Sequence, residues 1–504
     1  MVKLFNWCKD NIFLCITCAL LAFIPLYPKL PLFDVFGTWV NVRIEDVLVA
    51  GALGFYLLTR ILKKEKPKTS LTLPIAIYWG VGLVSVSMSL LFIGPHLANY
   101  FPHLAVLHFV RRIEYMGLFF VAYEAIRRIK KVEPILWVLG ITTVLIIAYG
   151  FGQKFLGWPA FLTMNEEFAK GLPLRLPPTA RIPSTFGGHY DLAAFLVLLI
   201  PIFGSMVFGF KEWWKKILFF FFAAGSLLLL LMTASRISFG VYLISIITML
   251  LWQKKRIWII PVVVLSFVML NSVSVASDRF YKTFRFSDVI VDLSTGRPIG
   301  TLDNLEGGTA TVENQEQPDV ENLPKGSEFI GVGGGTKRTA KTIEFYKGHD
   351  LATGSGDLAT VSGSFLIQKA LVYDISITTR FQGQWPKAIE AFKRNILTGS
   401  GYSTLSVASD GDYFRMLGET GLLGTVAFLG ILYYAFTVFL RLKDKLTFVS
   451  RAYVIGLFAG IVGLLLNAIL IDVFEASKVA ISYWIILGLL FSYFNIKAIK
   501  AINR

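Results

Sequence analysis

Four side chains in this sequence could together bind a diphosphate and transfer a group from it. Arg181, Arg236 and Arg380 carry guanidinium groups, whose planar fork matches two phosphate oxygens at once. Asp410 supplies a carboxylate that could accept the proton of an attacking hydroxyl group. The arginines would then stabilise the departing diphosphate. This chemistry requires no metal, and we expect none, because the outward segments offer no convincing cluster of His, Asp and Glu.

Three charged residues lie close together within one apolar segment. Arg111, Arg112 and Glu114 occupy the outer third of residues 105–126. Ionisable side chains are costly there, so Arg112 and Glu114 are candidates for supporting roles at the same site. The alternative is structural, because Arg111 and Glu114 are three residues apart and could pair along one helix face.

Two further polar residues stand next to the main candidates, and both could support them. His189 closes the Pro- and Gly-containing stretch that begins at Arg181, a composition that favours a shaped turn over the membrane surface. Asp412 follows Asp410 by two positions. Simpler alternatives stay open, because Arg181 could meet lipid headgroups and Asp412 is expected to be a solvated surface charge.

The elements that must position these residues are membrane-spanning helices, in an all-α fold. The chain has 504 residues, of which 55% are hydrophobic and 16% charged, and its mean hydropathy is +0.63. A span needs about 20 mostly apolar residues. Twelve segments meet this expectation, at 9–27, 44–62, 72–93, 105–126, 133–154, 190–209, 215–233, 236–252, 257–273, 417–440, 452–473 and 478–496.

Clusters of Lys and Arg predict how these segments cross the membrane. Such a cluster follows every even-numbered segment, whereas the short connections after odd-numbered segments carry much less positive charge. Because cytoplasmic loops concentrate Lys and Arg, both termini are expected in the cytoplasm. The same clusters explain most of the formal net charge of +16, so no nucleic-acid partner is expected.

Two outward segments divide the chain into three regions. Residues 1–273 hold the first nine spans with an outer loop at 155–189, residues 274–416 form an extracytoplasmic domain, and residues 417–504 hold the last three spans. The domain has an unusual insert at 289–375, in which alternating stretches at 364–367 and 372–377 predict strands. The Gly-rich stretch 331–335 lacks the residues of a phosphate loop and predicts a turn. Residues 386–395 predict a short amphipathic helix.

Four local motifs, in order along this topology, resemble the O-antigen ligase and polysaccharide polymerase family of bacterial envelope glycosyltransferases. The motifs are residues 181–201, the hairpin Thr233-Ala234-Ser235-Arg236, the stretch from Arg380 through Trp385 and Ala388 to Gly399-Ser400-Gly401, and residues 410–424. The likeness covers most of the chain in topology, including the large loop between the ninth and tenth spans.

The resemblance implies a GT-C-like membrane fold, no cofactor and an active site on the outer face of the bacterial cytoplasmic membrane. It implies an undecaprenyl-diphosphate-linked glycan donor and a glycan, lipid or protein hydroxyl as acceptor, with a chain-length regulator as a further partner left open. Arg181 and Arg236 would bind the donor diphosphate, and Arg380 would act at the site.

One departure from the family pattern concerns the base. Ligases carry a His-Asn pair ahead of the Glu-x-Gly-Leu-Leu-Gly sequence, and here Asp410 and Gly411 stand in those positions. A carboxylate can also accept a proton, so transfer chemistry remains feasible. The substitution weakens the ligase assignment and favours a polymerase or another glycan transferase.

Two other classes of protein remain open from the sequence. Twelve spans with cytoplasmic termini also suit a transporter or a lipid-linked glycan flippase, although the two halves show no clear repeat. A structural or sensory membrane protein is the third candidate, against which the outward arginines argue mildly.

Overall fold

The protein divides into two compact units. The computed structural model describes residues 7–8, 10–36, 38, 40–65, 69–97, 100–126, 133–163, 166–281, 284–292, 298–301, 309–313, 338–347, 357–373, 380, 384–405, 410–446 and 448–502. The first unit comprises Met1–Ser277 and Arg380–Arg504, and the second comprises Asp278–Thr379.

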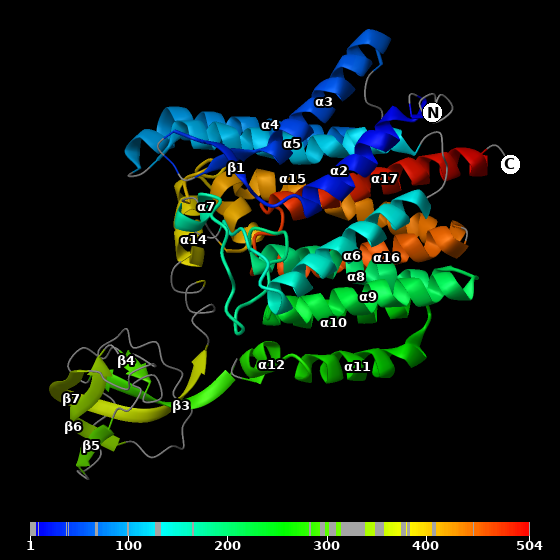
Figure 1. The fold of residues 1–504 in the computed structure, drawn as a ribbon. Helices are drawn as coiled ribbons and strands as arrows, with labels where there is room; N and C mark the ends of the chain where they lie inside the picture. The colour runs from blue at the N-terminus through cyan, green and yellow to red at the C-terminus, as the bar shows by residue number, and fades with distance from the viewer. Residues whose placement is uncertain are drawn as a thin grey trace. The chain divides into compact units, whose positions relative to one another are not determined.

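The first unit is a bundle of helices (Figure 1), and each of the twelve predicted apolar segments coincides with one of them. The long helices are α2 (Ile12–Leu26), α3 (Ile44–Lys63), α4 (Thr72–Met88), α5 (Pro102–Ala125), α6 (Glu133–Phe155), α8 (His189–Gly209), α9 (Trp213–Met232), α10 (Arg236–Trp252), α11 (Ile259–Asn271), α15 (Asp412–Leu442), α16 (Phe448–Asn467) and α17 (Ser477–Ile502).

Among the described residues, seven helices are long and apolar enough to cross a membrane, by length and composition. They are Thr72–His96, Glu133–Phe155, His189–Gly209, Trp213–Met232, Asp412–Lys445, Phe448–Asn467 and Ser477–Phe494. Three shorter apolar helices, Ile12–Leu26, Arg236–Trp252 and Arg256–Asn271, accompany them. The protein is therefore a mostly helical membrane protein.

The centre of the bundle is formed by helices that are distant in sequence. Helix α8 packs against α9, α10 and α16, and α17 packs against α5. Small residues allow the closest approach: a Cβ atom on Gly460 of α16 would lie 2.4 Å from the carbonyl oxygen of Leu198 in α8. Close packing of this kind stabilises helix pairs where no water is available to drive association.

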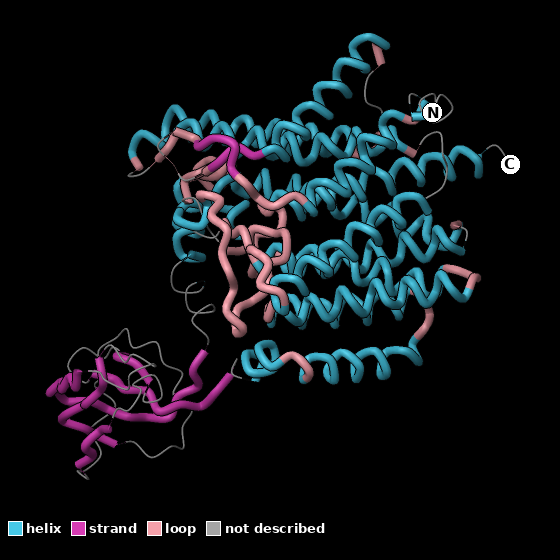
Figure 2. The backbone as a smooth tube through the Cα atoms, viewed as in Figure 1, coloured by secondary structure: helices cyan, strands magenta, loops and turns pink. Residues whose placement is uncertain are grey.

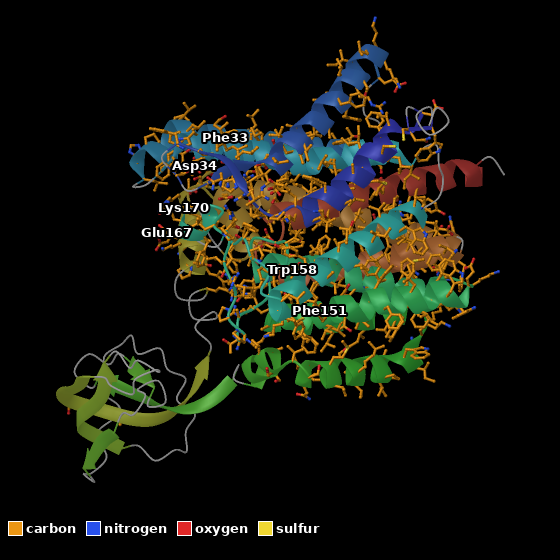
Figure 3. The ribbon with its side chains drawn as sticks, in the orientation of Figure 1. Phe33, Asp34, Phe151, Trp158, Glu167 and Lys170 are labelled. Carbon is orange, nitrogen blue, oxygen red and sulfur yellow. The ribbon has the colours of Figure 1, made fainter. Side chains whose placement is uncertain are left out.

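The two ends of the bundle differ. The first turn of α2 and the last turns of α17 lie at one end, and most of the irregular segments gather at the other (Figure 2). The second end carries the hairpin of β1 (Pro31–Asp34) and β2 (Asn41–Arg43), and the short α7 (Glu166–Ala169). Asn41 Nδ2 donates a hydrogen bond of 2.9 Å to the carbonyl oxygen of Ala169, which joins the hairpin to α7. Figure 3 labels Glu167 and Lys170 here.

Helix α15 is broken at Gly421, which has φ +64° and ψ −164°. The break lets residues 396–401 pair with the exposed backbone groups of α15. The N–H groups of Leu422 and Leu423 donate to the carbonyl oxygens of Ile396 and Leu397 over 2.9 and 3.0 Å. On the other side of the break, Ser400 and Gly401 donate to the carbonyl oxygens of Gly418 and Glu419.

Two glycines are required at this crossing. A Cβ atom on Gly421 would lie 2.4 Å from the nitrogen of Gly399, and one on Gly399 would lie 2.5 Å from the backbone of Glu419. Both residues also have positive φ, which only glycine adopts at low cost. The motif glycines of the sequence therefore bring two segments of the first unit into backbone contact.

The second unit holds a five-stranded antiparallel sheet with strand order β4-β3-β7-β6-β5. Its strands are β3 (Phe284–Asp292), β4 (Pro298–Thr301), β5 (Thr309–Glu313), β6 (Arg338–Lys347) and β7 (Asp357–Tyr373). The predicted strand at 364–367 is confirmed within β7. The predicted strand at 372–377 is described only to Tyr373, and the Gly-rich turn at 331–335 lies outside the described residues.

The segment after the second unit returns to the helical bundle. Helix α14 (Trp385–Arg394) confirms the predicted amphipathic helix at 386–395, with Pro386 in its first turn. It packs against α15. This places Arg380, α14 and the start of α15 in one unit with the helices that carry Arg181 and Arg236.

Candidate functional site at one end of the bundle

Arg380 and Asp410 form a direct ion pair. Arg380 Nη2 lies 3.0 Å from Asp410 Oδ2, and the side chain of Arg380 is 2% exposed whereas that of Asp410 is 42% exposed. A nearly buried guanidinium thus holds a carboxylate that solvent can reach. This arrangement orients the carboxylate while leaving it accessible to a substrate.

The backbone around Asp410 is held by the start of α14. The N–H of Asp410 donates to Gln384 Oε1 over 2.6 Å, and Trp385 Nε1 donates to the carbonyl oxygen of Asp410 over 3.3 Å. The ring of Trp385 stacks on that of Phe414, with centroids 4.2 Å apart. The motif tryptophan therefore fixes the position of Asp410 through a hydrogen bond and an aromatic contact.

The proton affinity of Asp410 is higher than that of an ordinary aspartate. Burial raises the pKa of its carboxyl group, and the charge of Arg380 and its hydrogen bond only partly offset this effect. A carboxylate with a raised pKa is a stronger general base than a fully solvated one. The environment of Asp410 is therefore compatible with accepting a proton.

Arg181 is held by two residues at the start of α8. Arg181 Nη1 lies 2.6 Å from His189 Nε2 and 3.4 Å from the hydroxyl of Tyr190. The guanidinium also lies 5.9 Å from the centre of the Tyr190 ring. His189, predicted as a supporting residue, is thus in direct contact with Arg181.

The turn after Arg181 is fastened to three neighbouring segments. Ser184 Oγ donates to the carbonyl oxygen of Ile146 in α6 over 2.7 Å, and Thr185 Oγ1 donates to that of Pro25 in α2 over 2.7 Å. The N–H of Ile182 donates to the carbonyl oxygen of Met232 at the end of α9 over 3.1 Å. These bonds give the shaped turn that the Pro and Gly residues predicted.

Arg236 is the first residue of α10, directly after a tight turn. Ser235 caps the helix by accepting a hydrogen bond from the N–H of Ser238 over 3.4 Å. Arg236 lies within electrostatic range of Tyr190, Arg181 and Arg380. The structure therefore brings the three predicted arginines to one region, with Asp410 attached to Arg380.

The prediction that Asp412 is a solvated surface charge is wrong. Its side chain is 2% exposed, and its carboxylate accepts hydrogen bonds from the N–H groups of Val473 and Phe474, over 2.7 and 3.2 Å. These N–H groups belong to the connection between α16 and α17. Asp412 therefore has a structural role, joining the start of α15 to that connection.

Arg112 and Glu114 interact with different neighbours. Arg112 forms an ion pair with Glu475 and donates to the carbonyl oxygen of Phe474 over 3.0 Å. Glu114 instead shares a pocket with Arg111. Arg112 therefore belongs with the connection between α16 and α17, and Glu114 belongs with the pocket that Arg111 lines.

A buried charge network around Arg415 was missed in the sequence. Arg415 Nη1 lies 3.0 Å from Asp472 Oδ2, and Arg415 Nε lies 3.4 Å from both Glu419 Oε1 and Glu475 Oε1. Arg415 Nη2 lies 3.4 Å from His108 Nδ1. The four-residue spacing of Arg415 and Glu419 was the available signal, since it places both on one helix face.

The carboxyl group of Asp472 interacts electrostatically with Asp410, the candidate base. It lies between α16 and α17, and burial raises its pKa to about 6, an effect that Arg415 opposes and the charge of Asp410 strengthens. Two carboxylates, Asp410 and Asp472, therefore interact at the same end of the bundle.

Within the described part of the chain, no group of three or more His, Cys, Asp and Glu side chains is placed to hold a metal ion. The recognisable chemistry is that of a cationic surface beside a carboxylate on a helical membrane protein. Comparison with protein-family models and with curated proteins gives no match.

Proposed function

We propose that this protein is a glycosyltransferase of the cytoplasmic membrane that transfers a glycan from an undecaprenyl-diphosphate-linked donor to a hydroxyl acceptor. Two observations carry the proposal: Arg236 lies within electrostatic range of Arg181 and Arg380, and Arg380 pairs with the accessible carboxylate of Asp410. The proposal includes the identity of the donor and of the acceptor. It also includes a relation to the O-antigen ligases and polysaccharide polymerases.

The transfer step uses each of these side chains. Asp410 accepts the proton of the acceptor hydroxyl as its oxygen forms a bond to the anomeric carbon of the donor sugar. The bond between that carbon and the diphosphate oxygen breaks, and the electron pair leaves with the diphosphate. Arg181 and Arg236 stabilise the charge that develops on the leaving group.

Arg380 has a different role from the other two arginines. Its short contact with Asp410 Oδ2 holds the carboxylate in one orientation. The same contact lowers proton affinity, and burial of Asp410 more than offsets that loss. Arg380 therefore orients the base.

The proposed topology has twelve spans, cytoplasmic termini and a site on the outer face. The basic clusters after even-numbered segments support it. So does the bundle, in which the start of α2 and the end of α17 lie opposite the end that carries α14 and most loops (Figures 1 and 2). The unit Asp278–Thr379, with the five-stranded sheet, then belongs to the extracytoplasmic part of the chain, and the predicted domain at 274–416 is narrower than expected because Arg380 and α14 belong to the helical unit.

The test combines a gene deletion with single variants. In the deletion strain, surface glycans and lipid-linked intermediates are profiled together. Loss of long polymer with single units still attached indicates a polymerase, and accumulation of lipid-linked polymer with no attachment indicates a ligase. Arg181→Ala, Arg236→Ala and Asp410→Ala should reproduce the deletion while the protein still inserts.

Purified protein distinguishes transfer from transport. In vesicles that contain lipid-linked donor and no acceptor, a flippase moves the donor across the bilayer, whereas a transferase leaves its distribution unchanged.

Full polymer production by the Arg181→Ala, Arg236→Ala and Asp410→Ala variants would refute the proposed site. Arg256→Ala is the matched control, since Arg256 is exposed in the short helix before α11.

A further inference from the structure

A second polar site lies away from the three arginines. A partly open pocket of about 240 Å³ is lined by residues of the β1–β2 hairpin, the first turns of α3 and the first half of α5. Arg181, Arg236, Arg380 and Asp410 are not among its lining residues. The pocket is therefore separate from the proposed transfer site.

The polar lining of this pocket comprises Asn41, Asp46, His108, Arg111 and Glu114. Arg111 contributes a guanidinium, and Asp46 and Glu114 both lie within electrostatic range of it. Asn41 also lines the pocket and is 3% exposed. Its Nδ2 donates to Ala169, whereas its buried Oδ1 has no hydrogen-bond partner among the described residues. Such a buried acceptor is costly unless a ligand satisfies it.

The rest of the lining is aliphatic and continues onto the outer surface of the bundle. Val47, Leu107 and Val110 line the pocket and are 56%, 39% and 40% exposed. Phe33 on β1, labelled in Figure 3, is 60% exposed. Aliphatic and aromatic side chains exposed on a membrane protein face acyl chains or the headgroup layer.

We propose that this pocket binds the phosphoethanolamine headgroup of a membrane phospholipid. Arg111 binds the phosphate, and the ammonium group donates to Asn41 Oδ1 and to the carboxylates of Asp46 and Glu114. The acyl chains lie along Val47, Leu107 and Val110.

The charge of the lining selects this occupant. A purely anionic headgroup would meet the two carboxylates without a compensating cation of its own. A trimethylated ammonium carries the right charge, but it has no N–H group for Asn41 Oδ1. A headgroup with both a phosphate and a donating ammonium offers a partner to Arg111, to Asn41 Oδ1 and to the two carboxylates.

The test measures lipid binding and does not depend on transfer activity. The full chain is purified in detergent and mixed with equal amounts of phosphatidylethanolamine, phosphatidylcholine and phosphatidylglycerol with identical acyl chains. Bound lipid is then counted by native mass spectrometry. We expect phosphatidylethanolamine to be retained above the other two.

Variants assign the binding to this pocket. Arg111→Gln and Glu114→Gln should each weaken retention of phosphatidylethanolamine about tenfold, the loss of one charge-assisted hydrogen bond. Arg256→Gln, at an exposed position outside the pocket, should retain it as the wild type does. Val110→Trp leaves all charges in place and should reduce retention by filling the space.

Two results would overturn the proposal. One is equal retention of the three lipids by the wild type. The other is retention at the wild-type level by variants whose thermal unfolding in detergent is unchanged. If a charge variant fails to fold, Val110→Trp still decides the matter, because its position is partly exposed and the larger ring alters no ion pair.

Discussion

The guanidinium of Arg380, which is 2% exposed, lies 3.0 Å from the carboxylate of Asp410, which is 42% exposed. The two residues are thirty positions apart in the sequence and meet because α14 folds back onto α15. A buried cation that holds an accessible carboxylate is the arrangement on which the proposed chemistry depends.

Asp410→Asn should abolish the base while preserving shape. Loss of a general base lowers kcat by about 10²–10⁴-fold. Asp410→Glu, which keeps the carboxylate, should retain more activity. Transfer from a lipid-linked donor by purified protein measures both. Equal activity of Asp410→Asn and wild type would exclude Asp410 as the base.

The pH profile of transfer should report the raised pKa of Asp410. Its base form is the deprotonated carboxylate, so kcat/KM should fall as pH decreases through a pKa above that of an ordinary aspartate. Arg380→Gln removes the positive charge that lowers the pKa of Asp410, so the fall in kcat/KM should move to still higher pH. If kcat/KM falls at the same pH in Arg380→Gln and wild type, a group other than Asp410 controls the profile.

Arg181→Lys should separate charge from geometry. Lysine retains the positive charge but lacks the fork that binds two phosphate oxygens. We expect KM for the donor to rise about tenfold, as for the loss of one charge-assisted hydrogen bond. Arg175→Lys is the control, because Arg175 lies in the same loop and is exposed. Similar KM values for the two variants would contradict this role.

Replacing Arg415 by Met should destabilise the protein strongly. Asp472, Glu419 and Glu475 would lose the cation that they share. Removing one partner of a buried ion pair costs about 3–5 kcal/mol of unfolding free energy. Thermal unfolding in detergent measures the loss. Arg394→Met, at an exposed position of α14, should leave stability nearly unchanged.

Stability should also depend on pH through Asp472. Its pKa rises from the ordinary 3.8 to about 6, so between these values the folded protein holds a proton that the unfolded chain has released. The unfolding free energy therefore decreases as pH rises through this window and is constant above it. Asp472→Asn should flatten this part of the curve, and an unchanged slope would assign it to other groups.

The sequence by itself determined the helices and the residue types available for chemistry. Each predicted apolar segment is helical, because a run of about 20 apolar residues excludes other structures in a bilayer. The Trp385–Arg394 helix and the strand within β7 were likewise readable from local patterns. The glycines at 399 and 421 stood out as motif positions before any contact was known.

Only the tertiary structure decided which of these residues meet. Asp412 was expected at the surface and is buried against the α16–α17 connection, and Arg415 pairs with Asp472 from a different segment. The order of strands in the sheet could not be predicted from local sequence patterns either. The periodicity of apolar residues predicts which face of a single segment is buried. An ion pair between distant segments depends instead on how the helices pack. That packing is set by small residues such as Gly460, whose neighbour Leu198 is far away in the chain.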